Sequence, residues 1–186
     1  MVGKYRIMKI KSLTIYCSSS ENLDKKFYDL AEKIGYFLGQ NQITIIYGGG
    51  NIGLMGKLSN AALKKGSNII GVIPEFLKIG ENLNLDISKT IIVKNMAQRK
   101  KILFEKGDAF LILPGGSGTI EEATEVISWK ILGVHKKLII IFNFENYWNS
   151  MIEMYNNSKK NKFGDKNLQS VCKTVKTFEE FSLLFK

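Results

Sequence analysis

The chain has 186 residues, of which 45% are hydrophobic and 24% are charged, and its formal net charge is +10. Its length fits one domain, residues 1–186, and its composition excludes a disordered or fibrous protein. The lysines are spread along the chain in short pairs, so we expect solvated lysines and an anionic small-molecule ligand rather than nucleic acid.

Short apolar runs alternate with amphipathic stretches from one end of the chain to the other. In chain order, the pattern predicts a strand at 13–16, a helix at 23–39, a strand at 43–47, a helix at 53–65 and a strand at 68–73. It continues with a strand at 90–93, a helix at 96–106, a strand at 109–113 and a helix that begins near Thr119. The last predicted elements are a strand at 138–142, a helix at 147–159, a short strand at Val171 and a helix from Phe178.

Continuous apolar strands that alternate with helices indicate a parallel sheet covered on both faces. We therefore predict one Rossmann-like α/β domain, with no repeat and no second domain. In such sheets, ligands bind at the carboxyl ends of the strands. The chain has two glycine clusters at such ends, and we expect the two strands to be neighbours.

The first glycine cluster, YGGGNIGLMG, follows the strand at 43–47 and opens a helix. Gly48, Gly50 and Gly53 have the G-x-G-x-x-G spacing of dinucleotide-binding turns, which is a weak signal on its own. A nucleotide-triphosphatase loop is excluded, because Leu58 stands where a serine or threonine would bind magnesium. A dehydrogenase with Glu75 as its ribose-binding acid is a minor alternative, since no second catalytic group accompanies it.

The second glycine cluster, PGGSGT, follows the strand at 109–113. Glycines let the backbone approach a ligand closely, and the helix that begins near Thr119 adds unpaired amides and the positive end of its dipole. Residues 115–119 therefore predict a phosphate site. A tight turn without a ligand is the alternative, and the presence of two such turns favours a ligand.

Two glutamates, Glu121 and Glu122, follow the phosphate turn at once. Thr119 and Glu122 fit a capping box, in which Thr119 caps the helix and Glu122 reaches back to its N–H. A carboxylate here would also repel a phosphate, which suggests that it acts on a cation instead. Cleavage of an N-glycosidic bond develops an oxocarbenium ion on the ribose, which a carboxylate can stabilise while it activates water.

Arg99 and Lys100, in the segment NMAQRKK, lie in the first turns of a predicted helix, where cations are unfavourable to the helix dipole. A solvated basic face is one interpretation, and it suits Lys101. An anionic partner is the other, since the Arg99 guanidinium offers a planar fork to a phosphate or a carboxylate.

The residue inventory argues against several other chemistries. His135 is the only histidine, which disfavours a Ser-His-Asp triad, and Ser117 lacks the G-x-S-x-G context. Cys17 and Cys172 have no metal-ligand spacing, so we expect no metal, no cofactor and a reduced, cytoplasmic location. The longest apolar runs are too short to span a bilayer, and the basic N-terminal residues lead straight into a strand, so we expect neither a membrane span nor a secretory signal.

The motifs GGGNIGLMG, MAQRK and PGGSGTIEE, in this order, resemble those of the Lonely Guy family of cytokinin riboside 5′-monophosphate phosphoribohydrolases. The likeness runs from about Leu13, where IYCSSS is similar to the opening strand and loop of the family, to about Tyr155. Some members were formerly labelled lysine decarboxylases because of the same P-G-G-x-G-T-x-x-E motif. This chain departs from the family in CSSS, in the serine of PGGSGT and in the flank of Glu81, which bears on the specificity for the base.

The resemblance implies hydrolysis of AMP or an N6-substituted adenosine 5′-monophosphate to free base and ribose 5-phosphate, without a metal, by a homodimer or larger assembly. Arg99 and Glu122 match the residues credited with catalysis, although the sequence leaves open whether Glu121 or Glu122 is the catalytic carboxylate. Substrate-binding roles fall on Glu81, Lys100, Gly115, Gly116, Ser117, Gly118, Thr119, Glu121, Ser128, Gly49 and Gly50.

A Rossmann-like protein that binds a nucleotide or molybdenum cofactor without hydrolysing it is the alternative, because it would keep the glycines without needing Glu122. Lysine decarboxylation has little support, since that chemistry normally needs a lysine that holds pyridoxal phosphate and none is singled out.

Overall fold

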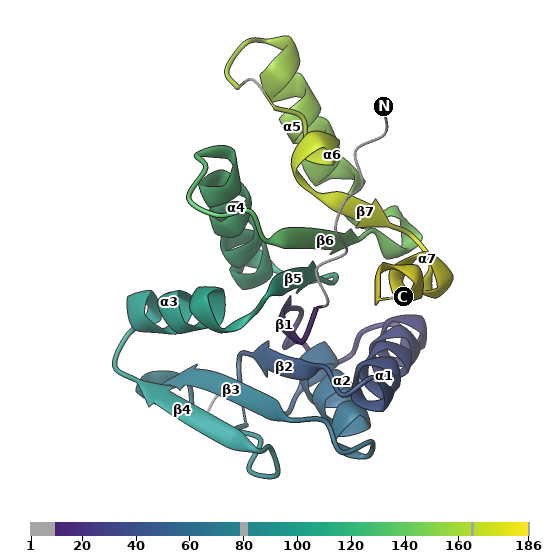
Figure 1. The fold of residues 1–186 in the computed structure, drawn as a ribbon, viewed down its shortest axis with the longest axis vertical. Helices are drawn as coiled ribbons and strands as arrows, with labels where there is room; N and C mark the ends of the chain where they lie inside the picture. Colours follow the sequence, from purple (N-terminus) through teal and green to yellow (C-terminus); the bar gives the residue numbers. More distant parts are fainter. Residues whose placement is uncertain (1–9, 79–81, 165, 186) are drawn as a thin grey trace.

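The computed structural model describes residues 10–78, 82–164 and 166–185 of the chain. Seven parallel strands form one sheet with helices packed against it (Figure 1). This arrangement confirms the predicted Rossmann-like α/β fold. Within the described residues, no helix has both the length and the apolar character needed to cross a membrane.

The observed elements follow the predicted alternation closely. The strands are β1 Ser12–Tyr16, β2 Thr44–Tyr47, β3 Ile69–Pro74, β4 Lys89–Val93, β5 Ala109–Ile112, β6 Leu138–Phe142 and β7 Lys173–Val175. The α-helices are α1 Lys25–Gln40, α2 Gly53–Leu63, α3 Met96–Lys106, α4 Ser117–Ile131, α5 Asn149–Lys160, α6 Leu168–Val171 and α7 Phe178–Ser182. The described residues also form three short 3-10 turns, η1 Glu75–Leu77, η2 Phe144–Asn146 and η3 Leu183–Phe185.

The strand order is β4-β3-β2-β1-β5-β6-β7. Strands β2, β3 and β4 are therefore added in succession on one side of β1, and from β5 onward the strands are added on its other side, where β5 pairs with β1. The expectation that the two glycine clusters follow neighbouring strands is therefore wrong, because β1 lies between β2 and β5. This change of side, the sheet reversal, places the loop after β1 between the two clusters, at the point where such sheets bind ligands.

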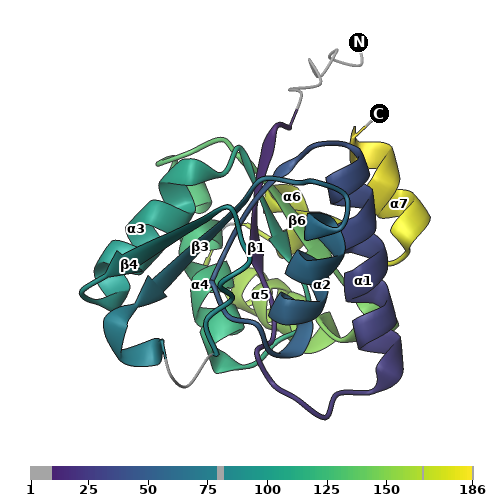
Figure 2. The same cartoon turned by 90° about the horizontal axis from the view of Figure 1, so that it is seen from below.

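The sheet is buried on both faces, which explains why its strands are continuously apolar. Ile45 and Ile140 belong to the core under α1, α2 and α7, whereas their neighbours Ile46 and Ile141 belong to the core under α3, α4 and α5. Figure 2 shows these two helical layers on either side of the strands. Successive side chains of a strand point to opposite faces, so each strand contributes to both cores.

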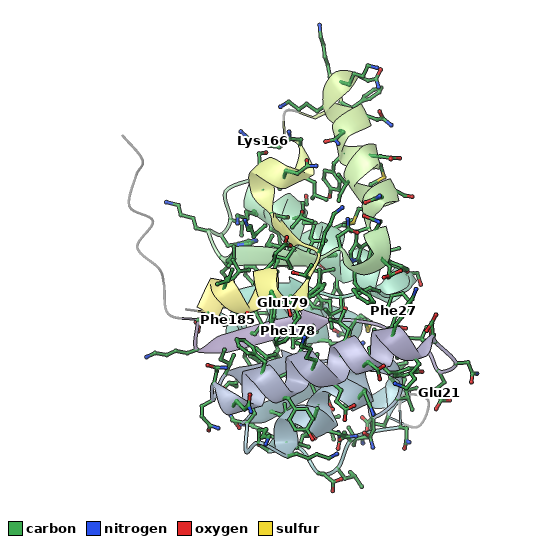
Figure 3. All side chains as sticks on the ribbon, turned by 90° about the vertical axis from the view of Figure 1, so that its right-hand side faces the viewer. Glu21, Phe27, Lys166, Phe178, Glu179 and Phe185 are labelled. Carbon is green, nitrogen blue, oxygen red and sulfur yellow. The ribbon has the colours of Figure 1, made fainter. Side chains whose placement is uncertain are left out.

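The C-terminal segment, α7 and η3, packs against α1 in one of these two helical layers. Phe178 and Phe185 approach Phe37 of α1 with ring centroids 5.6 Å apart in both cases, at nearly perpendicular angles. Figure 3 shows both residues over the α1 helix. Such edge-to-face contacts add packing energy to the burial of the rings.

The prediction of a strand at Val171 is wrong, because residues 168–171 form the short helix α6. The Asn167 side chain accepts a hydrogen bond from the Ser170 N–H at 3.0 Å, which caps this helical turn. The last strand, β7, follows it and pairs with β6, with Thr174 opposite Ile141. A side-chain cap thus overrides the strand preference of a single β-branched residue.

His135 lies in the loop between α4 and β6 and contacts residues of α3, α4 and β5. Its Nε2 lies 2.8 Å from the Val126 carbonyl, and its Nδ1 accepts a hydrogen bond from the Lys137 N–H at 3.2 Å. Its ring packs edge-on against Phe104 and Phe110. Burial lowers the pKa of His135 from its ordinary value, the Val126 carbonyl acts in the opposite direction, and the charges of Lys130 and Lys137 lower it further.

We predict that the free energy of unfolding falls when His135 becomes protonated. Because its pKa is lower in the folded state, stability is full above the unfolded value of about 6.5 and declines as the pH falls toward the folded value. Thermal melts at about pH 7.5 and pH 5.5 should show a smaller pH-dependent loss for His135→Gln than for the wild type. An equal loss in both proteins would contradict this assignment.

Candidate active site

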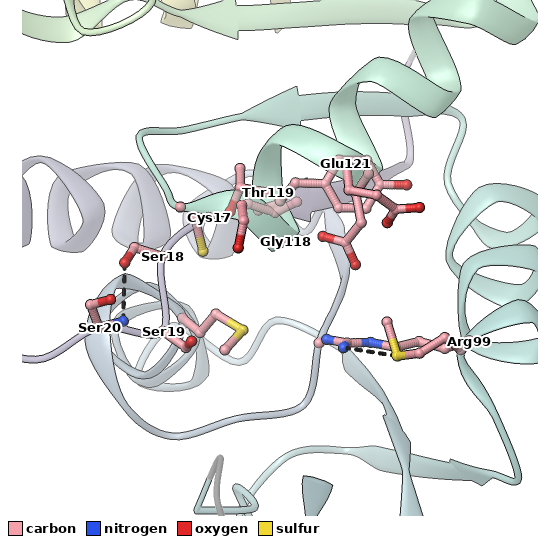
Figure 4. Close-up of a pocket in the computed structure, with 16 residues that line it drawn as sticks. Cys17, Ser18, Ser19, Ser20, Arg99, Gly118, Thr119 and Glu121 are labelled. Carbon is pink, nitrogen blue, oxygen red and sulfur yellow. Dashed lines mark hydrogen bonds between the residues drawn. The ribbon is translucent and has the colours of Figure 1, made fainter.

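A cavity of about 230 Å³ opens at the carboxyl ends of β1 and β5, beside the start of α4. Residues 15–20, Gly48, Met55, Met96, Arg99, residues 116–119, Glu121 and Glu122 line it. Figure 4 shows Ser18, Ser19 and Ser20 on one side of the hollow and Arg99 on the other, with Gly118, Thr119 and Glu121 along a third side. Residues from four separate segments of the chain therefore meet at the sheet reversal.

Helix α4 begins at Ser117, with Gly116 as its N-cap residue, two positions earlier than expected. The capping-box interpretation of Thr119 and Glu122 is therefore wrong, because Thr119 is already the third residue of the helix. Thr119 is buried, and its side chain occupies the space that a Cβ on Gly115 would fill. The turn thus needs glycine at 115 so that the helix can start this close to the end of β5.

The start of α4 provides backbone donors at the cavity. The first amides of an α-helix have no partner within the helix, and the dipole adds partial positive charge. A Cβ on Gly116 or Gly118 would meet no atom within 4 Å, so both residues border open space. Backbone donors beside open space at a helix N-terminus are the arrangement with which proteins bind anions, so the phosphate site predicted at residues 115–119 remains a prediction that this geometry allows.

The loop after β1 is a part of the site that the analysis of residue types did not identify. The Ser18 N–H donates to the Pro114 carbonyl at 3.1 Å, and the Ser18 carbonyl accepts from the Leu54 N–H at 2.9 Å. Ser18 Oγ accepts from the Ser20 N–H at 3.0 Å. These bonds hold the loop between the two glycine turns, and only the position of β1 at the centre of the sheet could have indicated this role.

Arg99 is buried at the cavity although it carries a charge, with 7% of its surface exposed. It lies in the first turn of α3, and its Nη1 is 4.0 Å from Met96 Sδ. A Cβ on Gly48 would collide with the Arg99 guanidinium and would lie 2.9 Å from Met55 Sδ. Gly48 therefore makes room for an arginine, and this explains one glycine of the first cluster without a dinucleotide.

The other glycines of the first cluster serve the packing of the turn. Gly53 has φ +60°, and a Cβ there would lie 2.6–2.8 Å from backbone atoms of residues 18–20. Gly49 has φ +86° and packs against β3, while Gly50 forms a β-bridge with Leu83. Neither Gly49 nor Gly50 lines the cavity.

Lys100 bridges α3 to α4, where its amino group contacts two carboxylates. Lys100 Nζ lies 2.5 Å from Glu121 Oε1 and 2.7 Å from Glu125 Oε2. The hydrogen bonds that Lys100 donates to Glu121 and to Glu125, in this order of size, raise the pKa of Lys100 above its ordinary value. Glu125, whose side chain is 18% exposed, was missed by the sequence analysis because it lies outside the recognisable motif.

Tyr16, the last residue of β1, is a second residue that the sequence analysis missed. Its ring stacks on Phe110 at 6.0 Å, and it borders the cavity. Burial raises its pKa well above the ordinary value, and the charges of Glu122 and Glu125 raise it further. Its hydroxyl therefore stays protonated beside these carboxylates.

Three other expected substrate contacts, Lys100, Gly115 and Ser128, do not line the cavity. Ser128 is exposed in the fourth turn of α4. Glu81 lies outside the described residues. Across the described ranges, no group of three or more His, Cys, Asp or Glu side chains is arranged to hold a metal ion.

The sequence has known relatives over most of its length. Residues 55–183 match the protein family described as "Possible lysine decarboxylase". The chain is 40% identical over 143 residues to the cytokinin riboside 5′-monophosphate phosphoribohydrolase of Rhodococcoides fascians, which covers 76% of this chain and 72% of that protein. It is also 40% identical over 144 residues to cytokinin riboside 5′-monophosphate phosphoribohydrolase LOG1 of Arabidopsis thaliana, which covers 77% of this chain and 68% of that protein.

Two solved structures share the fold at low identity. The molybdenum cofactor binding protein of Rippkaea orientalis matches with a TM-score of 0.70 over 95% of this chain and 96% of that chain, at 18% identity. The molybdenum cofactor carrier protein of Chlamydomonas reinhardtii matches with a TM-score of 0.68 over 92% and 93% of the two chains, at 13% identity. The TM-scores show a common fold, and at such low sequence identities the matches show nothing further about function.

We predict that Gly48→Ala displaces the Arg99 guanidinium with little loss of stability. The atoms that the new methyl group meets are the ends of two flexible side chains, Arg99 and Met55, so they can move. The chain has only two arginines, Arg6 and Arg99, so the Arg99 Nε–H resonance is readily followed by NMR. It should shift in Gly48→Ala and stay in place in the control Gly118→Ala, whereas an unchanged resonance in both would contradict the contact.

Proposed function

The chain belongs to the Lonely Guy family of cytokinin riboside 5′-monophosphate phosphoribohydrolases, which the family description "Possible lysine decarboxylase" includes, and from this membership we propose its reaction. It hydrolyses the N-glycosidic bond of AMP or an N6-substituted adenosine 5′-monophosphate. The products are the free base and ribose 5-phosphate. The reaction needs one water and no metal or cofactor.

One observation supports this proposal above the others. A helix N-terminus suited to a phosphate and a buried arginine line the same cavity of about 230 Å³, and Glu122 lines it too. Gly115, Gly116, Ser117, Gly118 and Thr119 supply the turn and the amides that bind the phosphate. The ribose then lies over the cavity, with its anomeric carbon toward α3 and α4.

In the proposed mechanism, the bond between the anomeric carbon and the base nitrogen breaks, and its electron pair leaves with the base. Positive charge develops on the ribose, and the Glu122 carboxylate stabilises it. Water attacks the anomeric carbon, gives up a proton to Glu122, and becomes the new hydroxyl of ribose 5-phosphate. The departing base takes up one proton from solvent, and Glu122 returns to solvent the proton that it took from the water, so the net change is the addition of one water. Arg99 neutralises and orients the anionic substrate in this buried site.

The contacts of Lys100 favour Glu122 over Glu121 as the catalytic carboxylate. Lys100 holds Glu121 at 2.5 Å and Glu125 at 2.7 Å, which commits both carboxylates to the α3–α4 bridge. Lys100 adjoins Arg99 on α3, and Glu121 adjoins Glu122 on α4. The ion pair between Lys100 and Glu121 therefore fixes the position of Arg99 relative to Glu122. We therefore assign Lys100 and Glu121 to positioning rather than to direct contact with the phosphate.

Three further proposals concern the protein as a whole. The strands from β1 to β7 form a single sheet, which supports one domain over residues 1–186. Ile131, Leu132 and Val134 expose 36%, 73% and 63% of their surfaces at the end of α4, which supports a homodimer or larger assembly. A nucleoside monophosphate substrate suits a cytoplasmic enzyme.

A carrier without hydrolase activity is the competing function. The two solved relatives that bind or carry molybdenum cofactor share the fold at 13–18% identity, whereas the two phosphoribohydrolases share 40% identity. A carrier would need the glycine turn but no carboxylate beside the ribose. The difference between these functions therefore rests on Glu122.

We predict that the 5′-phosphate is required for efficient turnover. The amides of α4 and Arg99 contribute charge-assisted contacts to it, so adenosine should have a kcat/KM at least about 100-fold below that of AMP. Release of free base, measured by chromatography with AMP, N6-isopentenyl-AMP and adenosine, checks this. Equal efficiency with nucleoside and nucleotide would contradict the phosphate site, and no base release from either nucleotide would contradict the proposed function.

We predict that Arg99→Ala and Glu122→Gln fail in different ways. Arg99→Ala should raise KM and lower kcat, because its positive charge acts on both substrate and transition state. Glu122→Gln should lower kcat by about 100- to 1000-fold with little change in substrate affinity, because its charge acts only as the bond breaks. The matched control Glu153→Gln, on the exposed side of α5, should keep wild-type kinetics. A Glu122→Gln variant with near-normal kcat would contradict the assignment of Glu122 as the catalytic carboxylate.

A further inference from the structure

The turn between β6 and α5 has an unusual backbone. Glu145 and Asn146 have φ values of +53° and +58°, so two successive residues with side chains adopt the left-handed conformation. Such a pair is uncommon outside glycine and persists only where the surrounding structure holds it. The next residue, Tyr147, therefore leaves this turn in a direction that an ordinary turn would not give.

Several contacts hold this turn in place. Asn143, which is 1% exposed, accepts the Trp148 N–H through Oδ1 at 2.7 Å and donates its own N–H to the Val175 carbonyl at 2.7 Å. Lys176 Nζ donates to Asn146 Oδ1 at 2.9 Å. The turn is thus tied both to β7 and to the start of α5.

Tyr147 reaches from this turn to the glycine loop of the candidate site. Its hydroxyl donates to the Gly115 carbonyl at 2.7 Å. Its ring meets Trp148 edge-on, with centroids 4.9 Å apart, and Trp148 is buried. The bond spans 32 positions of the sequence, so it joins two segments that nothing local would connect.

The bond matters because of the geometry of a trans peptide, in which the carbonyl and the N–H point in opposite directions. The Gly115 carbonyl points to Tyr147, so the Gly116 N–H of the same peptide points the other way. The flanking carbonyls are fixed as well, since Pro114 accepts from Ser18 at 3.1 Å and Gly116 accepts from Ile120 at 3.0 Å. Three successive peptides therefore have carbonyls that are held by hydrogen bonds to other residues.

We propose that Tyr147 is a positioning residue that keeps the Gly115–Gly116 peptide from flipping, so that the Gly116 N–H faces the substrate phosphate. A peptide between two glycines rotates easily, because neither residue has a Cβ to restrict it. A flipped peptide would aim the Gly115 carbonyl at the phosphate and replace attraction with repulsion. This proposal rests on the proposed function, in which residues 115–119 bind the 5′-phosphate.

The test compares Tyr147→Phe with the wild type and with Tyr155→Phe. Tyr147→Phe removes only the hydroxyl and keeps the ring against Trp148. Tyr155 is a partly buried tyrosine on α5 that lies outside the candidate site, so it is the matched control. Calorimetry with AMP and with adenosine, on each protein with Glu122→Gln added so that AMP is bound and not cleaved, measures the part of the affinity that depends on the phosphate. NMR of 15N-labelled protein follows the Gly116 amide as inorganic phosphate is added.

In Tyr147→Phe, the preference for AMP over adenosine should fall by about tenfold, while the affinity for adenosine stays within about twofold. The Gly116 amide should shift with phosphate in the wild type and in Tyr155→Phe, and much less in Tyr147→Phe. An unchanged preference, or an equal loss for both ligands, would overturn the proposal and leave Tyr147 a packing residue. A wild type with no preference for AMP would overturn the phosphate site itself, and this proposal with it.

Discussion

The arrangement of the site depends on how the chain leaves β5 and enters α4. The helix starts only five residues after the strand ends, and it can do so because Gly115 leaves room for the Thr119 side chain. This close start brings the positive end of α4 to the edge of the sheet, where β1 and β5 meet. An anion bound there gains from backbone donors that are already fixed, so little reorganisation is needed when it binds.

The charges around the cavity are arranged in two layers. Arg99 and Glu122 line the cavity, while Lys100 holds Glu121 and Glu125 beside it. Because Arg99 and Lys100 are adjacent on α3 and the glutamates share α4, the ion pairs of Lys100 set the distance between the two helices. Gly48 completes the arrangement, since it gives the Arg99 guanidinium a place at the end of β2. A site that handles both a phosphate and a developing cation needs this separation of opposite charges.

Most of the fold could be predicted from the sequence, because buried parallel strands are continuously apolar and their boundaries are marked by glycine, proline and asparagine. The helix at 96–106 was predicted with its observed limits. The site was less predictable, because its residues meet only through the strand order. The wrong neighbour for β5 hid the role of the loop at 17–20, and the expected start of α4 at Thr119 produced a capping box that the structure does not contain. Tyr147 lies 32 positions from its partner, so no local pattern could reveal it.

The central claim is that one cavity holds the phosphate at the start of α4 and the glycosidic bond beside Glu122. A crystal structure of Glu122→Gln with AMP tests it most directly, because the variant should bind the substrate without cleaving it. The account predicts phosphate oxygens within hydrogen-bond distance of the amides of residues 116–118, the Arg99 guanidinium on the substrate, and the anomeric carbon next to residue 122. A nucleotide bound with its phosphate elsewhere, or with its ribose away from residue 122, would contradict it.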